Sequence, residues 1–342
     1  MRNQYILLHL KILQRVIQQK KINIRKIRNM LDCYFAYWRK NPISAQGPYM
    51  LSLDLSNECN ANCLFCRDAR GVIPDVNPKG RTGTIPKGKM PLEMALDIIR
   101  QLKDYLLIAV LYTNGEPLIY KDLARVIQSA TDQGVATMIA TNGSLLTERK
   151  IEELLDAGLD FVKIAISGFS KDIYNVQVRH GDIEKIKSNI RLLVEKNKKG
   201  RFGTVIMIDY ILYNYNQHEL KLVQDFCRPL GIMLNVRPGN PKGGLEDQEP
   251  ALSQAVLPLK GSCDWIWKAM QLDWNGDILA CCECAVWSDT TRYGTFKIGV
   301  TNLLEIWNGH SAQKMRMLLN EKGRGAVSVC SRCERTSITF KW

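Results

Sequence analysis

The segment Leu51-Ser-Leu-Asp-Leu-Ser-Asn-Glu-Cys-Asn-Ala-Asn-Cys-Leu-Phe-Cys66 carries the most information in this chain. It passes from an apolar run into three cysteines, Cys59, Cys63 and Cys66, with Phe65 just before the last. Three thiolates spaced this closely can bind three irons of a four-iron cluster, and no fourth cysteine lies nearby. An iron without a protein ligand can bind a substrate or cofactor, so the motif predicts chemistry at the metal.

Composition indicates a globular protein of a reducing compartment. Hydrophobic residues make up 46% of the 342 residues, which leaves room for one large domain and a smaller one. The 11 cysteines fall mainly into two groups, 59–66 and 263–333. Because no signal peptide and no apolar run of about 18–20 residues occurs, we expect a cytoplasmic protein whose cysteines bind metal.

The N-terminal residues 1–45 are predicted to form a basic helical extension. Residues 1–40 hold ten Lys or Arg and a single acid, Asp32, and so carry +9 of the net charge of +13. Apolar residues recur at helical spacing, including Leu13, Ile17, Ile24 and Trp38. Three roles are open: a cap on the rest of the protein, peripheral contact with an anionic membrane surface, or docking on a partner molecule.

After residue 46, short apolar runs alternate with helical patterns. Strands are predicted at residues 49–55, 107–112, 135–140, 161–166, 204–210 and 232–236, and helices at 91–103, 121–133, 147–157, 182–197 and 216–228. Strands alternating with helices require a parallel sheet with right-handed crossovers. Six repeats are too few for a closed eight-stranded barrel. We therefore predict an α/β fold, a partial (β/α)6 TIM-like barrel over residues 46–237.

Polar or glycine-rich segments follow the predicted strands. They are the cysteine run, Asn114-Gly-Glu-Pro117, Thr141-Asn-Gly143 and Ser167-Gly168. Loops after parallel strands open on one face of a barrel, so these segments are expected to meet there. Gly115 lets the backbone approach a ligand closely, and Glu116 offers a carboxylate to an ammonium group. Arg237 ends the sixth strand and is a candidate for an acidic substrate group or for a structural salt bridge.

These motifs resemble those of the radical S-adenosylmethionine (SAM) superfamily over residues 49–236. The cysteine run is similar to the cluster motif, and residues 114–117 are similar to the glycine–glutamate motif, with Asn114 where a Gly often stands. Thr141–Gly143 and Ser167 resemble strand ends that contact ribose, and Arg179 matches a position that often meets the methionine carboxylate. The resemblance implies cofactor contacts from Phe65, Asn114, Gly115, Glu116, Asn142, Ser167 and Arg179.

The resemblance also implies a mechanism. SAM binds the open iron, and the reduced cluster passes one electron to the sulfonium. The C–S bond breaks, and the 5′-deoxyadenosyl radical removes a hydrogen atom from substrate while the protein supplies geometry and excludes water. Such an enzyme requires a flavodoxin- or ferredoxin-type reductant.

The C-terminal part holds a second group of cysteines. Residues 238–260 are rich in Pro and Gly and are predicted to be a linker, or a loop across the barrel mouth. Within 261–342, four cysteines suffice for a closed four-iron cluster, with tetrahedral zinc as the competing interpretation. The predicted ligands are Cys263, Cys281, Cys330 and Cys333.

This part resembles the SPASM and shorter twitch extensions of radical SAM enzymes. Trp274–Cys282 and Ile306–His310 are similar to their signature segments. Since no cysteine follows Cys333, the resemblance implies one auxiliary [4Fe-4S] cluster, in a layout closest to the aminocyclitol dehydrogenase of butirosin biosynthesis. Cys282 and Cys284 compete with Cys281 for one ligand position, and the resemblance favours Cys281.

Three functions compete. The first is a radical SAM oxidoreductase that abstracts hydrogen from a small polar metabolite of sugar or aminocyclitol type, in an oxidation or a related rearrangement. The second is a maturase of a ribosomal peptide. The third, a basic zinc-bearing nucleic-acid-binding module, leaves the barrel motifs unexplained, so no nucleic-acid partner is expected. The sequence assigns no catalytic residue for the substrate.

Overall fold

The computed structural model describes residues 13–63, 87–239, 263–282 and 291–331. Several predictions lie outside these residues: Phe65, Cys66, Cys284, Cys333 and most of the predicted linker.

Six parallel strands form the centre of the molecule, in the spatial order β1-β3-β4-β5-β7-β8. Their bounds are β1 Met50–Leu53, β3 Ile108–Val110, β4 Ala136–Thr141, β5 Phe161–Ile166, β7 Val205–Leu212 and β8 Met233–Pro238. The spatial order of these six strands follows the chain order, because each strand is separated from the next by a helical crossover. The predicted partial barrel is confirmed.

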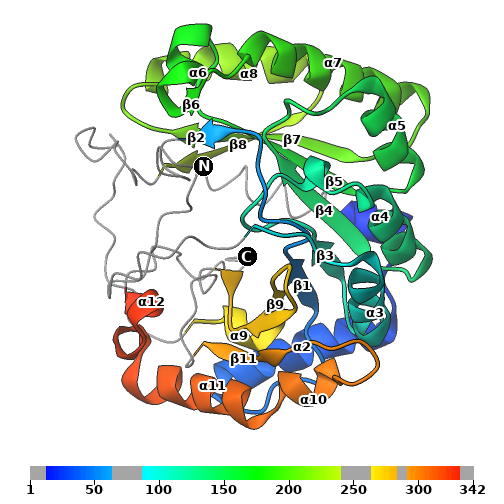
Figure 1. The fold of residues 1–342 in the computed structure, drawn as a ribbon, viewed down its shortest axis with the longest axis vertical. Helices are drawn as coiled ribbons and strands as arrows, with labels where there is room; N and C mark the ends of the chain where they lie inside the picture. The colour runs from blue at the N-terminus through cyan, green and yellow to red at the C-terminus, as the bar shows by residue number, and fades with distance from the viewer. Residues whose placement is uncertain (1–12, 64–86, 240–262, 283–290, 332–342) are drawn as a thin grey trace.

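Helices cover the outer face of this sheet (Figure 1). They are α3 Leu92–Leu102, α4 Leu123–Asp132, α5 Glu148–Asp156, α6 Lys171–Gln177, α7 Ile183–Lys199 and α8 Leu220–Leu230, with short 3-10 turns at Pro117–Ile119 and Gln217–Glu219. The helices and the outward-facing strand residues form one apolar core, in which Ile164 and Ile208 are fully buried. The alternate strand residues therefore face the barrel lumen.

Glycines end three of the helices before a strand begins. Gly134, Gly158 and Gly231 have φ values of +67°, +81° and +69°. This left-handed conformation suits glycine at the residue that follows a helix. Each glycine turns the chain directly into β4, β5 or β8.

The C-terminal part extends the same sheet. Its elements are α9 Trp265–Lys268, β9 Ala269–Leu272, β10 Asp277–Leu279, β11 Arg292–Thr295, α10 Leu303–Trp307, α11 His310–Lys322, the 3-10 turn Arg324–Ala326 and α12 Ser328–Ser331. Strand β9 pairs in parallel with β1, with Leu51 opposite Met270. Strands β10 and β11 continue the sheet in antiparallel fashion. The barrel and the C-terminal part therefore share one nine-stranded sheet.

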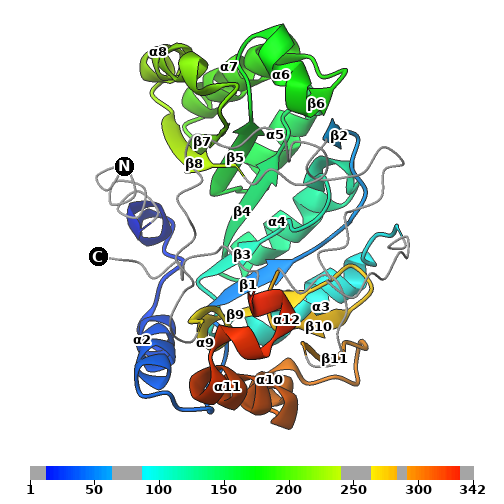
Figure 2. The ribbon, with the colours of Figure 1, turned by 90° about the vertical axis from the view of Figure 1, so that its left-hand side faces the viewer.

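The N-terminal extension packs on the protein. Residues 13–18 are helical, and α2 Ile24–Trp38 lies beside α9 (Figure 2). The side chains of Arg15 and Lys21 both contact Asp160, a fully buried residue that precedes β5. This arrangement is the one that the cap alternative predicts for residues 13–38.

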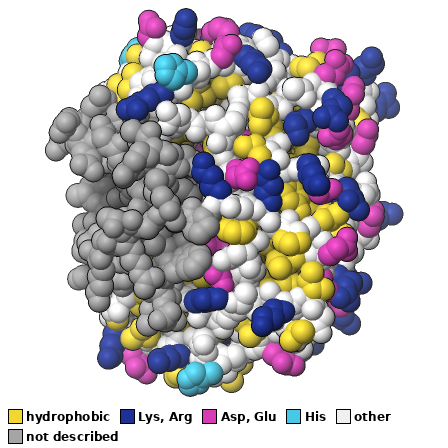
Figure 3. Space-filling model, viewed as in Figure 1, with side chains coloured by type: hydrophobic (Ala, Val, Ile, Leu, Met, Phe, Trp, Pro, Cys, Tyr) yellow, Lys and Arg dark blue, Asp and Glu magenta, His cyan; other side chains and the backbone are white. Residues whose placement is uncertain are grey.

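Both signs of charge occur on the described surface. On the face that Figure 3 shows, Lys and Arg side chains lie among Asp and Glu side chains. None of the helices in the described ranges has the length and apolar character that a membrane span needs.

Candidate functional site

The cysteine run and the segment of Arg179 lie side by side. The short strand β2 (Asn62–Cys63) pairs in antiparallel fashion with β6 (Val178–Arg179), with Cys63 opposite Val178 and Asn62 opposite Arg179. Each of these strands has only two residues, which is too short to show the alternation of apolar and polar residues that identifies a strand. The sequence therefore carried no signal for this pairing. It brings the predicted cluster ligand Cys63 and the predicted SAM contact Arg179 to one place.

Glu116 links the ends of β3 and β4. Its carboxylate accepts hydrogen bonds from the hydroxyl of Thr141 (2.7 Å), the backbone N–H of Asn142 (2.8 Å) and that of Leu118 (3.1 Å). The residue is 2% exposed, and burial raises its pKa above the ordinary value. The sequence predicted this carboxylate as the partner of an ammonium group. In the structure its carboxylate joins the loops after β3 and β4, and contact with an ammonium group stays a prediction.

Gly115 lies against the loop that leads into the cysteines. A Cβ atom at this position would stand 2.0 Å from the carbonyl oxygen of Ser56 and 2.7 Å from that of Glu58. The next residue, Glu116, donates its backbone N–H to Glu58. Close approach of two loops, both at the barrel mouth, therefore requires glycine here.

Asn142 connects the end of β4 to the cysteine loop. Its amide donates to Asn60 Oδ1 (3.0 Å), while its own Oδ1 accepts from the backbone and the hydroxyl of Ser144. Ser167 is 2% exposed, and its carbonyl accepts from the side chains of Asn216 and Tyr215. The loops after β1, β3 and β4 thus form one hydrogen-bonded rim, and the loop after β5 is bonded to the loop after β7.

A buried acid that the sequence reasoning missed supports this rim. Asp54 accepts hydrogen bonds from the side-chain amide of Asn114 (3.0 Å) and from its backbone N–H (3.3 Å). Burial raises the pKa of Asp54 to about 7, and the nearby carboxyl of Asp273 adds to this. The side chain of Asn114 therefore makes a hydrogen bond that glycine, the residue often found at this position of the family motif, could not make. The sequence did hold one signal that could have identified Asp54, namely an acidic residue within an apolar predicted strand.

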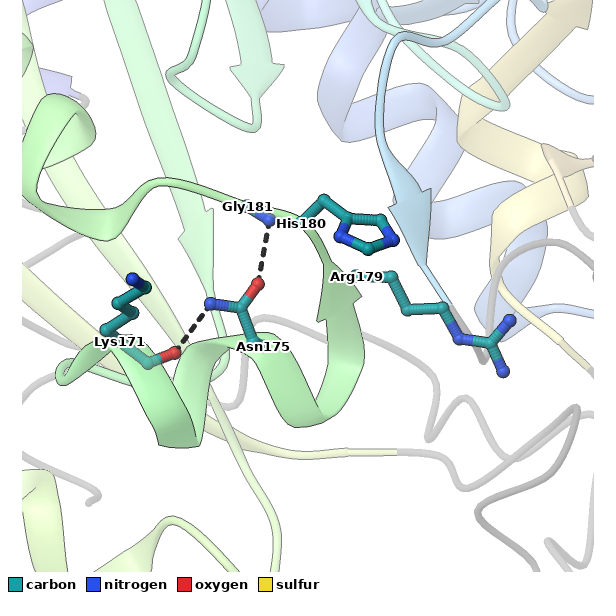
Figure 4. Close-up of a pocket in the computed structure, with 5 residues that line it drawn as sticks. All are labelled: Lys171, Asn175, Arg179, His180 and Gly181. Atoms are coloured by element: carbon teal, nitrogen blue, oxygen red, sulfur yellow. Dashed lines mark hydrogen bonds between the residues drawn. The ribbon is translucent and has the colours of Figure 1, made fainter.

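Arg179 lines a pocket of about 450 Å³ together with Lys171, Asn175, His180 and Gly181. In Figure 4 the amide of Asn175 bridges Lys171 and Gly181, and the Arg179 side chain extends away from them. His180 has a φ of +58°, a conformation uncommon for residues other than glycine. The pocket thus presents three basic side chains beside β2.

Three of the four predicted auxiliary ligands pack against one apolar cluster. Cys263, Cys281 and Cys330 all pack against the apolar cluster that contains Trp267 and Leu319. Burial raises the pKa of Cys263 to about 11, and Cys281 is close enough to contribute. Cys282 does not belong to this apolar cluster as described.

The donor sets fit iron–sulfur clusters. Cys59 and Cys63 are half-buried at the mouth, and the other three cysteines lie in an apolar environment. Within the described residues, no group of three or more His, Cys, Asp or Glu is arranged around one metal ion. A cluster has several irons, each bound by its own thiolate, so its ligands need not converge on one point.

Family models match most of the chain. The model of the Radical SAM superfamily matches residues 53–227, which is about half of the chain. The chain belongs to the radical SAM superfamily. A second model, described as an iron-sulfur cluster-binding domain (SPASM), matches residues 263–334. The predicted superfamily and extension are confirmed, and so is an enzyme that uses SAM, a [4Fe-4S] cluster and an auxiliary iron–sulfur cluster.

Curated relatives match this radical SAM enzyme over part of their length. A probable GTP 3′,8-cyclase of Methanocaldococcus jannaschii is 22% identical over 186 residues, covering 54% of this chain and 57% of the relative. An AdoMet-dependent heme synthase of Methanosarcina barkeri is 27% identical over 187 residues, covering 54% and 49%. The chain thus spans about half the length of the curated relatives it matches.

Solved structures share the fold. SuiB of Streptococcus suis, bound to precursor peptide SuiA, has a TM-score of 0.63 at 16% identity and covers 88% of this chain and 74% of its own. BtrN in complex with AdoMet and 2-DOIA has a TM-score of 0.53 at 18% identity, covering 85% and 94%. At such identities the likeness shows the fold alone. The roles of individual site residues stay predictions.

Proposed function

We propose that this enzyme cleaves SAM reductively and directs the resulting radical at a small polar metabolite of sugar or aminocyclitol type. An oxidation, a dehydrogenation or a related rearrangement would follow. The bound cluster and SAM supply the radical chemistry. The residues of this chain bind and orient the two reactants and exclude water.

The observation that carries the proposal is a polar wall on the inner face of β1 and β9, made mostly of buried side chains. The hydroxyl of Ser52 lies 3.3 Å from that of Thr113, and the amide of Gln271 donates to Thr113 (3.2 Å) and to Asp273 (3.0 Å). Asp54 lies at the same strand ends. Such a wall, immediately below the rim, suits a substrate with several hydroxyl or amino groups.

The rim has a positioning role in the proposal. We place SAM across Asn114, Gly115, Asn142 and Ser167, with Arg179 as the partner of its carboxylate. Phe65 and Cys66 lie outside the described residues and stay in the proposal as a cofactor contact and a cluster ligand. Glu116 and Asp54 act through the loops they hold.

For the auxiliary cluster we propose one [4Fe-4S] group bound by Cys263, Cys281, Cys330 and Cys333. The shared apolar environment of the first three supports this choice, and it supports Cys281 over Cys282. We also propose the division 1–45, 46–237, 238–260 and 261–342, with a flavodoxin- or ferredoxin-type protein as reductant.

The test uses anaerobically reconstituted protein with dithionite. SAM should yield 5′-deoxyadenosine and methionine slowly without substrate, and faster with the substrate. Addition of pooled polar metabolites should raise the rate of 5′-deoxyadenosine formation and give a product two mass units lighter or a rearranged isomer. Formation of S-adenosylhomocysteine alone would indicate ordinary methyl transfer and contradict the proposal.

A ribosomal peptide is the alternative substrate. The fold match to SuiB, a protein solved with its precursor peptide, favours testing it. Candidate precursor peptides enter the same assay, and a peptide that accelerates 5′-deoxyadenosine formation while the metabolite pools do not would replace the metabolite proposal.

For the extension we propose that residues 13–38 act as a cap. Helix α2 also exposes Ile24, Leu31, Phe35 and Trp38, the last at 78%. This apolar surface, with neighbouring basic residues, is the one that a peripheral contact with an anionic membrane would use. Sedimentation with acidic vesicles tests that second role.

A further inference from the structure

One wall of the barrel lumen carries charges. On β5, Ile164 belongs to the core beneath the helices, so Lys163 next to it lies on the lumenal face. The same alternation places Asp209 of β7 and both Asn235 and Arg237 of β8 on that face. Lys163 is a charged residue within an otherwise apolar strand, which sequence reasoning passed over.

These four side chains form one connected cluster around the carboxylate. Asp209 Oδ2 accepts from Arg237 Nε (2.8 Å) and lies 3.4 Å from Lys163 Nζ. Its Oδ1 accepts from the amide of Asn235 (2.5 Å). In the sheet, Lys163 is level with Met207 and thus deeper than Asp209, while Arg237 is level with Ile211 and nearer the mouth.

The cluster holds two cations for one carboxylate. Burial opposes charge on Lys163, but Tyr112 and Asp209 outweigh it and raise its pKa. Burial likewise opposes ionisation of Asp209, but Lys163 and Arg237 hold its pKa below the usual range. Lys163 and Asp209 are therefore charged near neutral pH, and with the guanidinium of Arg237 the cluster carries one net positive charge.

The cations, not the carboxylate, reach open space. The side chain of Asp209 is 3% exposed, whereas that of Lys163 is 20% exposed and that of Arg237 is 44% exposed. No described residue accepts a hydrogen bond from the Nη1 or Nη2 atoms of Arg237. Two lumenal residues beside the cluster, Ala140 and Ala165, are small and only partly buried.

A purely structural ion pair would need only one cation. A second cation in a partly buried position costs desolvation unless it meets another anion. Arg and Lys side chains with unused N–H groups are well suited to oxygen anions, because the guanidinium edge binds two oxygens at once and the ammonium adds a charge-assisted bond.

We propose that Lys163 and Arg237 form an oxyanion subsite in the barrel lumen that binds a phosphate or carboxylate group of the substrate. Asp209 is the positioning residue that orients both cations. The inference rests on the proposed function, since it supplies the substrate class for the same lumen. The reacting carbon would lie between this subsite and the rim.

The test measures anion binding to the reconstituted, SAM-loaded protein by calorimetry at fixed ionic strength, with inorganic phosphate and succinate as probes. Arg237→Gln and Lys163→Gln should each weaken the better-bound probe by about tenfold or more, because each removes a charge-assisted contact. Arg237→Lys and Lys163→Arg should retain part of the affinity. The tighter probe identifies the substrate group as a phosphate or a carboxylate.

The control is Arg228→Gln on α8, whose side chain is 75% exposed and lies outside the lumen. It should bind both probes as the wild type does. The subsite is rejected if the wild type binds neither probe, or if both Gln variants bind as tightly as the wild type.

Cleavage of SAM without substrate is followed in the same preparations. It should persist in all variants, which also shows that they fold. Its absence from the wild type would reject the proposed function, whereas intact cleavage with unchanged anion affinity in the Gln variants would reject the subsite alone.

Discussion

The hydroxyl of Thr141 donates a 2.7 Å hydrogen bond to the buried carboxylate of Glu116, which joins the end of β4 to the loop after β3. The same carboxylate also accepts the backbone N–H of Asn142. Two segments that are 25 residues apart in sequence therefore keep a fixed relative position at the barrel mouth. An apolar residue could not bridge them.

Replacing Glu116 separates a positioning role from direct contact with the cofactor. Glu116→Ala leaves buried donors unsatisfied, each at a cost of about 1–3 kcal/mol, so SAM affinity should fall by about tenfold. Glu116→Gln keeps one acceptor oxygen and should lose less. Equilibrium dialysis with labelled SAM measures both, and Glu58→Gln is the neighbouring control. Equal losses in the Gln and Ala variants would mean that the charge itself contacts SAM.

Iron content tests the two cysteine groups. Anaerobic reconstitution should give about eight irons per chain, because two four-iron clusters are expected. Ala at Cys59, Cys63 and Cys66 together should leave about four and abolish SAM cleavage. A triple variant that keeps all its iron would reject the first site.

Substitutions in the second cysteine group should affect substrate turnover without affecting SAM cleavage to the same extent. Changing Cys330 and Cys333 to Ala should spare much of the SAM cleavage and remove product formation, because SAM binds at the barrel mouth. As a matched pair, Cys281→Ala should lose the auxiliary iron and Cys282→Ala should keep it, given that only Cys281 packs with Cys263 and Cys330. Normal product formation by a folded Cys330/Cys333 variant would mean that this cluster has only a structural role.

The sequence predicted the elements whose pattern is local. The bounds of β5, Phe161–Ile166, coincide with the predicted run, because alternation and β-branched residues are legible over six positions. Gly134 and Gly231 are likewise local signals, because a left-handed residue after a helix has a strong preference for glycine.

Long-range pairings were not predictable from such patterns. The contact of β9 with β1 joins residues more than 200 positions apart, and nothing in either strand specifies the other. The pairing of Asn62 with Arg179 has the same character. Asp54 and Lys163 were overlooked because a single charged residue in an apolar run was taken as a break in the strand pattern. In a barrel, such a residue lies on the face of the strand that is turned toward the lumen.

Asp54 should make stability depend on pH. Its pKa is raised from 3.8 to about 7 in the folded protein, mainly by burial. The unfolded chain therefore ionises first, and stability is lost as pH rises from about 4 to about 7. The Asp54→Asn variant has no carboxyl group to ionise, and its side-chain oxygen can still accept a hydrogen bond from Asn114. The difference in unfolding free energy, variant minus wild type, should therefore increase by about 2 kcal/mol between pH 5.5 and 8.

Urea unfolding of the reconstituted proteins at several pH values measures this difference. Asp132→Asn, which changes an exposed carboxylate on α4, serves as the control and should show no such rise. A constant difference between Asp54→Asn and wild type over this pH range would mean that Asp54 ionises normally in the folded protein.

The buried contacts of Asp160 should make the extension essential for stability. Its Oδ2 accepts from Lys21 Nζ (2.6 Å) and from the backbone N–H of Thr137 (2.9 Å), and its Oδ1 lies 3.2 Å from Arg15 Nε. Removing one partner of a buried ion pair costs about 3–5 kcal/mol, because the remaining charge stays desolvated. Lys21→Met should therefore lower the urea midpoint strongly. Arg25→Gln, with a side chain 63% exposed in the same extension, should not. Equal midpoints for the two variants would mean that residues 13–38 are dispensable as a cap, and vesicle sedimentation would then become the deciding measurement for the extension.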